Sequence, residues 1–346
     1  MLDSPDPATG RSALLADHTT LRLGGPATGF VVARTEADLI DAVAAADAQD
    51  TSVLVLGGGS NLVVSDAGFD GTAIRVATSG IAFDRVGDRV VVRVAAGEPW
   101  DGIVAACLAE GLAGIECLSG IPGLAGATPI QNVGAYGTEI SDVVVGVRVF
   151  DRATGAQLRL DVSACGFGYR TSSLKGHDRY LVLGVEISLT RSVNSGPVHY
   201  AQLAGELGID VGATAAIRDV RAAVLELRAR KGMLLDPADP DSVSAGSFFT
   251  NPILDTADVP PGAPAWPAGD GRVKTSAAWL IEHAGFSRGY RRGPVGLSTK
   301  HTLALVNHGG ASTSDLLLLA RVIRDGVRDT FGVTLEVEPA LVGVSL

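Results

Sequence analysis

Residues 120–137 read GIPGLAGATPIQNVGAYG, and this stretch is among the most specific indicators of the fold. It has few bulky side chains, which favours close approach of the backbone to a ligand. At its centre, Gln131 and Asn132 supply amide donors and acceptors that a set of tight turns does not require. A series of tight turns is the alternative, and the segments on either side decide between the two.

A second glycine-rich segment, GGGSNL at residues 57–62, lies between two short apolar runs. Successive glycines leave backbone N–H groups free to converge on an anion, and the side chains of Ser60 and Asn61 add donors. The segment lacks the Lys-Ser/Thr ending of a P-loop, and Leu62 stands where a Rossmann fingerprint has its third glycine. By itself it fits a turn or a phosphate cradle equally well.

Together the two segments favour a long, flat ligand that is held through the backbone from two sides, as a flavin dinucleotide would be. Neither segment alone justifies this prediction. The residues predicted to contact the cofactor are Gly57, Gly58, Gly59, Ser60, Asn61, Leu62, Ile121, Pro122, Gly123, Gln131, Asn132, Gly134, Ala135 and Tyr136.

Length and charge limit the classes of protein that remain. The 346 residues exceed what one hydrophobic core usually spans, so two or three domains are expected. A formal net charge of -10 leaves no basic surface for nucleic acid or for an anionic membrane. No apolar run is long enough to cross a bilayer, and the N-terminus has no secretory signal pattern, which favours a cytoplasmic protein.

Three cysteines, Cys107, Cys117 and Cys165, have no CxxC spacing and leave one over in any pairing. Neither a disulfide framework nor a zinc site is therefore expected. We predict that all three are small buried hydrophobic residues and that the protein binds no metal.

Hydrophobic periodicity predicts a mixture of helices and strands. Thr35 and Asp38 form a capping-box pattern that opens a helix. We expect residues 1–12 to form a polar leader and the Pro/Gly-rich residues 259–271 to form a surface loop. Further helices are predicted over residues 99–108, 215–230, 276–284 and 314–331, and strands over residues 52–56, 73–76, 89–95, 143–150, 180–189 and 334–344.

Three places carry side chains suited to chemistry. Residues 244–252 read SAGSFFTNP, where Ser247 follows a flexible glycine and precedes two phenylalanines that can exclude water; an edge strand with core aromatics is the alternative. Arg170 lies among hydroxyl residues and could hold a carboxylate through two hydrogen bonds, or it could be a solvated surface arginine. Glu336 and Glu338 lie two apart on a predicted strand, where a solvated face is the alternative.

The order of these segments resembles that of the UDP-N-acetylenolpyruvoylglucosamine reductase (MurB) family, and the resemblance covers nearly the whole chain. Its most specific parts are residues 121–137 and residues 245–252. The segments that carry it are residues 19–27, 57–62, 121–137, 169–170, 245–251 and 274–281 and the terminal strand with its glutamates.

The resemblance implies an α+β protein with a vanillyl-alcohol-oxidase-type FAD-binding fold in two subdomains, residues 1–80 and 81–212. A C-terminal α+β substrate-binding domain would span residues 213–332, and residues 333–346 would form a terminal strand carrying the catalytic glutamate. FAD and NADPH are the implied cofactors. The implied reaction reduces the enolpyruvyl ether of UDP-N-acetylglucosamine to UDP-N-acetylmuramate for peptidoglycan, in a monomer that acts on small molecules.

The resemblance also assigns roles to single residues. The family's general-acid serine falls on Ser247, its carboxylate-polarising arginine on Arg170 and its glutamate on Glu338. These types suit the chemistry, because addition of hydride to the vinyl carbon builds an enolate that a cation and a hydrogen-bonding group stabilise. A serine hydroxyl can then protonate the adjacent carbon, since the carbanion-like intermediate is a strong base.

Substrate contacts follow from the same resemblance. Tyr200 matches the tyrosine loop of the longer class of the family, whose ring closes over the diphosphate, and Lys231 and Asn251 match contacts to the UDP portion. One departure affects the last strand, because Pro339 and an alanine follow Glu338 where the family usually has Val-Arg. A glycine five places after Glu338 favours this register over one that uses Glu336.

Two other functions fit the same fold. The first is an oxidase of the same superfamily, although such enzymes often attach flavin through His or Cys and neither glycine segment contains a histidine. The second is a flavin- or nucleotide-binding protein without catalysis. The presence of serine, arginine and glutamate at the matched positions argues against the second alternative.

Overall fold

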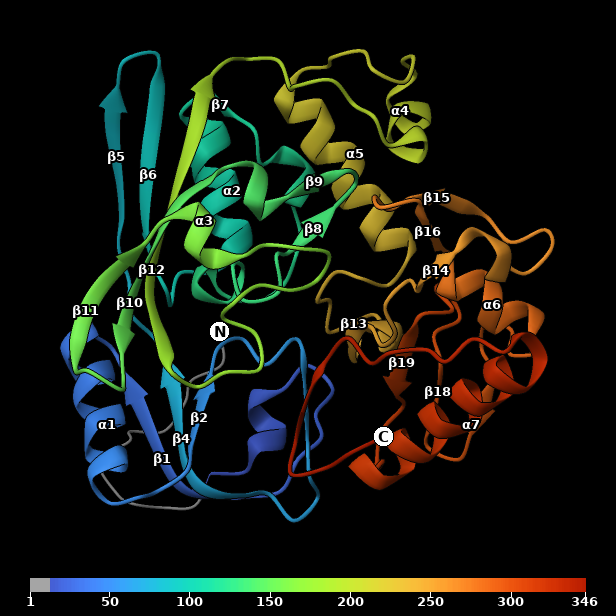
Figure 1. The fold of residues 1–346 in the computed structure, drawn as a ribbon, viewed down its shortest axis with the longest axis horizontal. Helices are drawn as coiled ribbons and strands as arrows, with labels where there is room; N and C mark the ends of the chain where they lie inside the picture. Colours follow the sequence, from blue (N-terminus) through green and yellow to red (C-terminus); the bar gives the residue numbers. More distant parts are fainter. Residues whose placement is uncertain (1–12) are drawn as a thin grey trace. The chain divides into compact units, whose positions relative to one another are not determined.

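A computed structural model describes residues 13–346, so the predicted leader at residues 1–12 lies outside the described residues. The chain is α+β and divides into two compact units (Figure 1). Within the described residues, unit 1 comprises Ala13, Thr28–Gly58 and Asp70–Ala229, and unit 2 comprises Leu14–Ala27, Gly59–Phe69 and Arg230–Leu346.

Unit 1 begins with a three-stranded sheet in the order β1-β4-β2, beside which α1 lies (Figure 1). The predicted capping box opens α1, because Thr35 accepts a hydrogen bond from the Asp38 N–H and the Asp38 side chain accepts one from the Thr35 N–H. Strand β2 pairs in parallel with β4 and leads directly into the glycine segment at residue 57. The elements are β1 (Ala27–Ala33), α1 (Glu36–Ala48), β2 (Val53–Leu56) and β4 (Phe69–Val76).

A larger antiparallel sheet, in the order β11-β10-β12-β6-β5 with β7 paired to β12, makes up the centre of unit 1. Strand β12 is buried over most of its length, as expected of a central strand that is covered on both faces. The elements are β5 (Ile81–Val86), β6 (Arg89–Ala95), α2 (Trp100–Ala109), β7 (Leu112–Ala113), β10 (Val144–Asp151), β11 (Ala156–Leu160), α3 (Val162–Cys165) and β12 (Tyr180–Arg191).

The three cysteines lie in this unit and are free and buried, which confirms the prediction that they are not disulfide-bonded. Burial raises the pKa of Cys107 to about 12, so its thiol stays protonated and unreactive at neutral pH. Two short strands and two helices complete the unit, and the apolar face of α5 packs in a small core of its own. These elements are β8 (Gly134–Ala135), β9 (Thr138–Glu139), α4 (Ala201–Leu207) and α5 (Ile217–Arg230).

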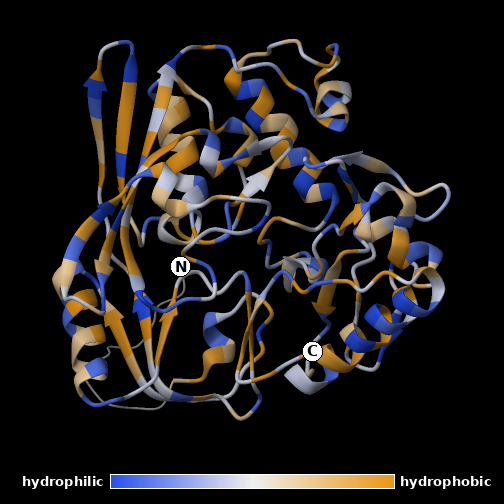
Figure 2. Ribbon diagram, viewed as in Figure 1, coloured by the Kyte–Doolittle hydropathy of each residue, from blue (hydrophilic) through white to orange (hydrophobic). Residues whose placement is uncertain are grey.

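Unit 2 contains a four-stranded sheet in the order β13-β19-β18-β17, a three-stranded sheet in the order β14-β16-β15, and the parallel pair β20-β3. Hydrophobic and hydrophilic residues alternate along α7 (Figure 2), whose apolar side packs in the core of the unit. The elements are β3 (Leu62–Val64), β13 (Ser244–Ser247), β14 (Ile253–Asp255), β15 (Ala265–Pro267), β16 (Arg272–Thr275), α6 (Ala277–His283), β17 (Arg291–Arg292), β18 (Val295–Leu297), β19 (Ala304–Asn307), α7 (Thr313–Phe331) and β20 (Ala340–Val342).

The N-terminus of α7 is tied to the loop after β3. Ser312 and Asp315 form a capping box, and the Asp66 carboxylate accepts hydrogen bonds from the N–H groups of Thr313 (2.6 Å) and Ser314 (2.9 Å). Burial raises the pKa of Asp66, but these bonds outweigh it, and the net pKa lies below the ordinary value. An ionised Asp66 therefore connects the loop after β3 to the N-terminus of α7.

Two sequence predictions need correction. The Pro/Gly-rich residues 259–271 are not all loop, because Ala265–Pro267 pair with β16 as strand β15. The terminal strand is also shorter than predicted, since β20 covers only Ala340–Val342. Glu336 and Glu338 thus precede the strand in an extended segment, which meets Phe249 through a single bridge at Val337.

Two absences concern residues 13–346 only. No helix in this range is both long enough and apolar enough to span a membrane. The same range contains no group of three or more His, Cys, Asp or Glu side chains placed to hold a metal ion.

An ion pair between a buried carboxylate and a half-exposed guanidinium joins the end of β10 to the residue before β12. Asp151 is 1% exposed and accepts hydrogen bonds from Arg179 Nε (3.0 Å) and Nη2 (2.8 Å). The bonds from Arg179 lower the pKa of Asp151 to about 2, below its ordinary value near 3.9. Because the folded pKa is depressed, the pair stabilises the fold above about pH 4, and this stabilisation is lost as the pH falls toward 2.

We expect Arg179→Gln to destabilise the protein at pH 7 and to start acid unfolding at a higher pH than in the wild type, because Asp151 loses the partner that keeps it ionised. Urea unfolding at pH values from 7 down to 2.5 measures this, and the difference from wild type should shrink as the pH falls. Arg85→Gln, on an exposed arginine of β5, is the control. Equal pH dependence of the two variants would contradict the assignment.

Candidate functional site

The two glycine segments predicted to hold the cofactor meet in unit 1 through their backbones. A Cβ atom on Gly58 would lie 2.8 Å from Cα of Gly123, a distance that real Cβ contacts essentially never show. A Cβ on Gly57 would lie 3.7 Å from Cδ1 of Leu124. The structure therefore brings the end of β2 and residues 123–124 together, and only a side-chain-free residue 58 allows it.

Residues 123–126 are held against the connection between β6 and α2. The Trp100 N–H donates to the Gly123 carbonyl (3.0 Å), and the Gly126 N–H donates to the Ala96 carbonyl (2.9 Å). A Cβ on Gly126 would lie 2.6 Å from Cβ of Ala96. The segment is thus fixed against this connection, and close packing requires the glycine at residue 126.

The first glycine segment passes from unit 1 into unit 2 between Gly58 and Gly59. Gly59 has a φ of +62°, and its carbonyl accepts a hydrogen bond from the Thr20 N–H (3.1 Å). A Cβ there would lie 1.9 Å from the His18 carbonyl oxygen. Thr20 Oγ1 also donates to the Ser244 carbonyl (2.6 Å), so one threonine links the glycine segment to strand β13.

These segments fit a dinucleotide cofactor such as FAD. Backbone at Gly58 and Gly123 is bare of side chains where the two segments meet. The donor set that the predicted residues offer consists of backbone amides, hydroxyls and side-chain amides, which suits a pyrophosphate and a flavin ring. The contacts of the individual predicted residues with FAD stay predictions.

Arg170 lies against the second glycine segment. Its guanidinium donates to the carbonyls of Gly134 (2.7 Å) and Asn132 (3.4 Å). Lys175 Nζ donates to the Arg170 carbonyl (2.9 Å), which fixes the backbone of the loop as well. The structure therefore brings Arg170 together with two predicted cofactor residues, Asn132 and Gly134.

Asn132 ties the second glycine segment to the loop that carries Arg170. It is 1% exposed, and its Nδ2 donates to Glu139 Oε2 (2.7 Å) and to the Gly168 carbonyl (3.0 Å). Its Oδ1 accepts from the Ser141 N–H (3.1 Å). Because Gly168 lies two residues before Arg170, these bonds fix the loop that carries the guanidinium.

Backbone conformations that only glycine adopts readily are concentrated in this region. Such conformations cost about 1–3 kcal/mol each and persist where the surroundings impose them, often at functional sites. Three of the residues concerned, Asn132, Tyr136 and Arg170, are predicted site residues. Among residues 13–346, the non-glycine residues with positive φ are Arg22, Asp50, Asn132, Tyr136, Arg170 and Asp270.

Unit 2 brings Ser247 and Glu338 together. Ser247 pairs with Ala304 at the end of β13, after Gly246 with its φ of +70°. The next residue, Phe248, donates its N–H to the Leu303 carbonyl (2.7 Å) and accepts from the Glu338 N–H (2.9 Å). The backbone at Glu338 is therefore held one residue away from Ser247.

The register of the last segment is defined by its hydrogen bonds. The Glu336 carbonyl accepts from the Thr250 N–H (3.0 Å). Asn61, a predicted cofactor residue, meets Glu338 instead: its Nδ2 lies 3.5 Å from the Glu338 carbonyl, and its own carbonyl accepts from the Ala340 N–H (2.9 Å). The backbone of Glu338 thus lies between Phe248 and Asn61. The backbone of Glu336 instead meets Thr250, farther along the chain after β13.

The two phenylalanines after Ser247 belong to the core of unit 2. Phe248 is 1% and Phe249 0% exposed, and their rings meet edge to face with centroids 5.2 Å apart. This agrees with the core-aromatic alternative for these two residues. Ser247 itself is only partly buried, so its hydroxyl is not enclosed by that core.

The predicted substrate residues lie in both units. In unit 1, Tyr200 precedes α4, is 40% exposed, and meets Tyr136 edge to face with centroids 5.4 Å apart. In unit 2, Asn251 Oδ1 accepts from the Ala277 N–H (2.9 Å) at the start of α6. Lys231 lies near His301, whose pKa falls to about 4 because of burial and the charge of this lysine.

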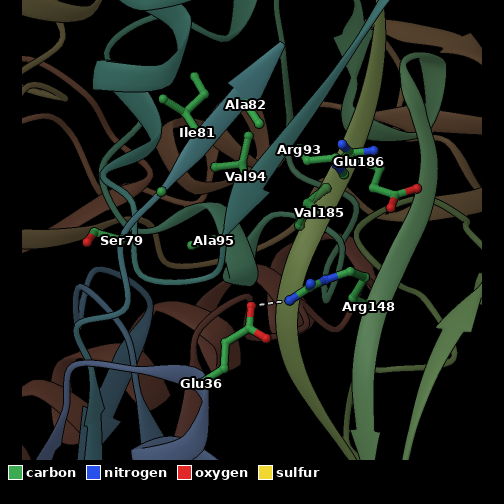
Figure 3. Close-up of a pocket in the computed structure, with 11 residues that line it drawn as sticks. Glu36, Ser79, Ile81, Ala82, Arg93, Val94, Ala95, Arg148, Val185 and Glu186 are labelled. Atoms are coloured by element: carbon green, nitrogen blue, oxygen red, sulfur yellow. Dashed lines mark hydrogen bonds and ion pairs between the residues drawn. The ribbon is translucent and has the colours of Figure 1, made fainter. Parts of the chain in front are cut away.

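A groove of about 270 Å³ also occurs in unit 1, between strands of the larger sheet and α1 (Figure 3). Glu36 and Arg148 form an ion pair across it. Arg93 and Glu186, which also line it, are each paired with a side chain of opposite charge. None of the predicted site residues lines this groove.

Several supporting residues were missed by sequence reasoning. Glu139 orders Asn132, Lys175 orders the Arg170 loop, and Thr20 links Gly59 to β13. Their side chains bind partners that lie far apart in the sequence or on loops, and no local pattern marks them. Thr20 lies within residues 19–27, which the resemblance singled out, and Glu139 and Lys175 lie a few residues after segments that were singled out.

Two family models match separate parts of the chain. Residues 27–161 match the family model of the FAD binding domain, and residues 237–342 match that of the UDP-N-acetylenolpyruvoylglucosamine reductase C-terminal domain. The UDP-N-acetylenolpyruvoylglucosamine reductase of Thermobifida fusca is 56% identical, over 97% of this chain and 98% of its own length. That of Saccharopolyspora erythraea is 54% identical, over 98% and 96%.

A solved structure is similar over the same extent. The UDP-N-acetylenolpyruvylglucosamine reductase from Thermus caldophilus has a TM-score of 0.67 and 29% sequence identity. The similarity covers 96% of this chain and 98% of that one. The fold that the sequence predicted, α+β with an FAD-binding part and a C-terminal part, is thereby confirmed.

We expect Gly58→Ala to weaken FAD binding by about tenfold or more, because the new Cβ must push residues 123–124 away from the end of β2. Titration of apoprotein with FAD, followed by quenching of flavin fluorescence, measures the affinity. Gly196→Ala is the matched control, since a Cβ at Gly196 meets nothing within 4 Å. An unchanged affinity in Gly58→Ala would show that the flavin does not depend on this contact.

Proposed function

Because the chain belongs to the UDP-N-acetylenolpyruvoylglucosamine reductase family, we propose that it reduces UDP-N-acetylglucosamine enolpyruvate to UDP-N-acetylmuramate with FAD and NADPH, in peptidoglycan biosynthesis. The family match of both parts of the chain supports this activity. We further propose a cytoplasmic monomer of the longer class of the family, with Tyr200 in its tyrosine loop.

Bound FAD would accept a hydride from NADPH and supply it to the enolpyruvyl double bond. The residues proposed to hold the cofactor are the predicted ones in the two glycine segments. In unit 1, the contact between Gly58 and Gly123 supports this proposal, because it leaves bare backbone where the segments meet. We also propose that residues 1–80 and 81–212 are the two FAD-binding subdomains, that residues 213–332 are the substrate-binding domain and that residues 333–346 are the terminal segment with the catalytic glutamate.

Arg170 is proposed to stabilise the negative charge that develops on the substrate carboxylate. The guanidinium donates to the Gly134 carbonyl, which holds it in place, so it needs little reorganisation during the reaction. The positive φ of Arg170, +53°, supports a functional role, since such a conformation is maintained at a cost.

Ser247 is proposed to donate the proton to the carbon next to the carboxylate, and Glu338 to stabilise the enolate that precedes this step. The observation that carries this part is the 2.9 Å hydrogen bond from the Glu338 N–H to the Phe248 carbonyl, which keeps the backbones of Glu338 and Ser247 adjacent. Serine suffices as an acid, because an enolate carbon is a far stronger base than the groups serine normally meets.

Tyr200, Lys231 and Asn251 are proposed to bind the UDP portion of the substrate. Tyr200 is 40% exposed, so its ring has room to contact a ligand. Lys231 brings a positive charge, which suits a diphosphate. Asn251 has one side-chain group, Oδ1, engaged with Ala277, which orients its amide.

We expect Ser247→Ala to bind FAD and to be reduced by NADPH as the wild type is, while turnover falls about 10²–10⁴-fold, since a general acid contributes about this much. Rapid mixing of the NADPH-reduced enzyme with the enolpyruvyl nucleotide, without oxygen, measures the second half-reaction. Reoxidation and product release at the wild-type rate would show that another group is the acid. Reoxidation by oxygen but not by the nucleotide in the wild type would favour the oxidase alternative.

We expect Glu338→Gln to slow reoxidation by substrate at least about 10²-fold and to leave reduction by NADPH nearly unchanged, because only the enolate step loses its stabilising group. Glu336→Gln is the matched control, two residues away in the same extended segment, and should behave as the wild type. A damaging Glu336→Gln with a normal Glu338→Gln would overturn the register proposed here.

A further inference from the structure

Gly120, the residue immediately before Ile121, is held on both sides by charged groups of unit 1. Its N–H donates to Asp101 Oδ1 (2.6 Å), and its carbonyl accepts from Arg228 Nε (3.1 Å). Gly120 has a φ of +70°, a conformation open to glycine. Both polar groups of this peptide backbone are therefore fixed by side chains from elsewhere.

Asp101 is in turn fixed by a second arginine. Arg221 Nη1 and Nη2 donate to the two Asp101 oxygens at 2.7 and 2.8 Å, the parallel two-bond geometry that makes such pairs specific. Asp101 lies in the first turn of α2, whereas both arginines lie on α5. Arg221 and Arg228 are two helical turns apart, so they lie on the same face of α5.

The Asp101 carboxylate keeps its charge at neutral pH. Burial raises the pKa of Asp101, but the hydrogen bonds from Arg221 and Gly120 and the charge of Arg228 outweigh it. Burial lowers the pKa of Arg228, and the groups that oppose this are Tyr136 and Asp101. A guanidinium only 8% exposed is expensive to desolvate, and its carbonyl partner is a fixed backbone group.

The same first turn of α2 fixes the backbone on either side of Gly120. Trp100 Nε1 donates to the Leu118 carbonyl (3.1 Å), and the Trp100 N–H donates to the Gly123 carbonyl (3.0 Å). Residues 118, 120 and 123 are thus each anchored. Ile121 and Pro122, two of the predicted cofactor residues, therefore lie between anchored positions.

We propose that Asp101, Arg221 and Arg228 are positioning residues for the flavin: this Gly120 clamp holds Ile121–Gly123 in the conformation that binds the cofactor. The inference rests on the proposed contact of residues 121–123 with FAD. Helix α5 lies in residues 162–236, which neither matched family model covers. A helix outside the recognised FAD-binding domain therefore takes part in cofactor binding.

The test compares Arg221→Gln with Arg152→Gln. Arg152 forms an equivalent pair with Asp47 in unit 1, through Nε and Nη2, and its burial is similar, with side chains 15% and 34% exposed against 19% and 40% for Arg221 and Asp101. The dissociation constant of FAD and the thermal midpoint of the apoprotein are measured for both variants. The thermal midpoint reports the loss of stability that any broken ion pair causes.

We expect Arg221→Gln to raise the dissociation constant at least about tenfold, and Arg152→Gln to leave it within about twofold of wild type, at a similar loss of thermal stability. Asp101→Asn, which keeps the size of the side chain, should weaken binding likewise and serves if Arg221→Gln does not fold. Arg221→Lys should recover only part of the affinity, because lysine cannot form the paired bonds.

Equal affinities in Arg221→Gln and Arg152→Gln would overturn the clamp. The Gly58→Ala variant separates this outcome from a failure of the proposed flavin placement. Weakened binding in Gly58→Ala together with normal binding in Arg221→Gln and Asp101→Asn would reject the clamp alone. Normal binding in all of these variants would reject both the clamp and the placement of FAD against residues 121–123.

Discussion

The close approach of Gly58 to Gly123 constrains most of unit 1. A single Cβ at residue 58 would come within 2.8 Å of the Gly123 backbone, so the end of β2 and the second glycine segment can meet only as bare backbone. That contact requires residue 123 to be held in place, which Trp100 and the connection after β6 achieve. The sheet, α2 and the two glycine segments are therefore connected, and close backbone packing rather than contacts between side chains holds the segments together.

The sequence predicted correctly those features that depend on neighbouring residues or on hydrophobicity. The capping box at Thr35 and the core position of Cys107 follow from neighbouring residues or from hydrophobicity alone. Prediction from the sequence failed where pairing across the chain decides. Residues 265–267 form a strand because β16 offers a partner, whereas residues 334–339 pair only through the single bridge between Val337 and Phe249. Pairing of that kind depends on tertiary structure, which overrides local propensity.

The predicted site residues divide in the same way. Their types and order could be read from the sequence, but the groups that orient them could not, because Glu139 and Asp101 act through contacts made by folding. Asn132 illustrates the difference. The sequence marks it as a donor for a ligand, whereas the structure engages its side chain with three protein groups that fix the loop before Arg170. The position of the loop that carries Arg170 thus depends on buried polar bonds that the sequence does not show.

Pro339, the residue after Glu338, also restricts the backbone of its segment. Pro339 has no N–H, yet the donors on either side of it are both used, Glu338 toward Phe248 and Ala340 toward Asn61. The hydrogen bonds of this segment therefore need no backbone N–H at residue 339. Proline also favours extended conformations in the preceding residue, and Val337, next to Glu338, forms the bridge to Phe249. The departure from Val-Arg thus restrains the glutamate before its contacts form, since fewer unfolded conformations compete with the extended one.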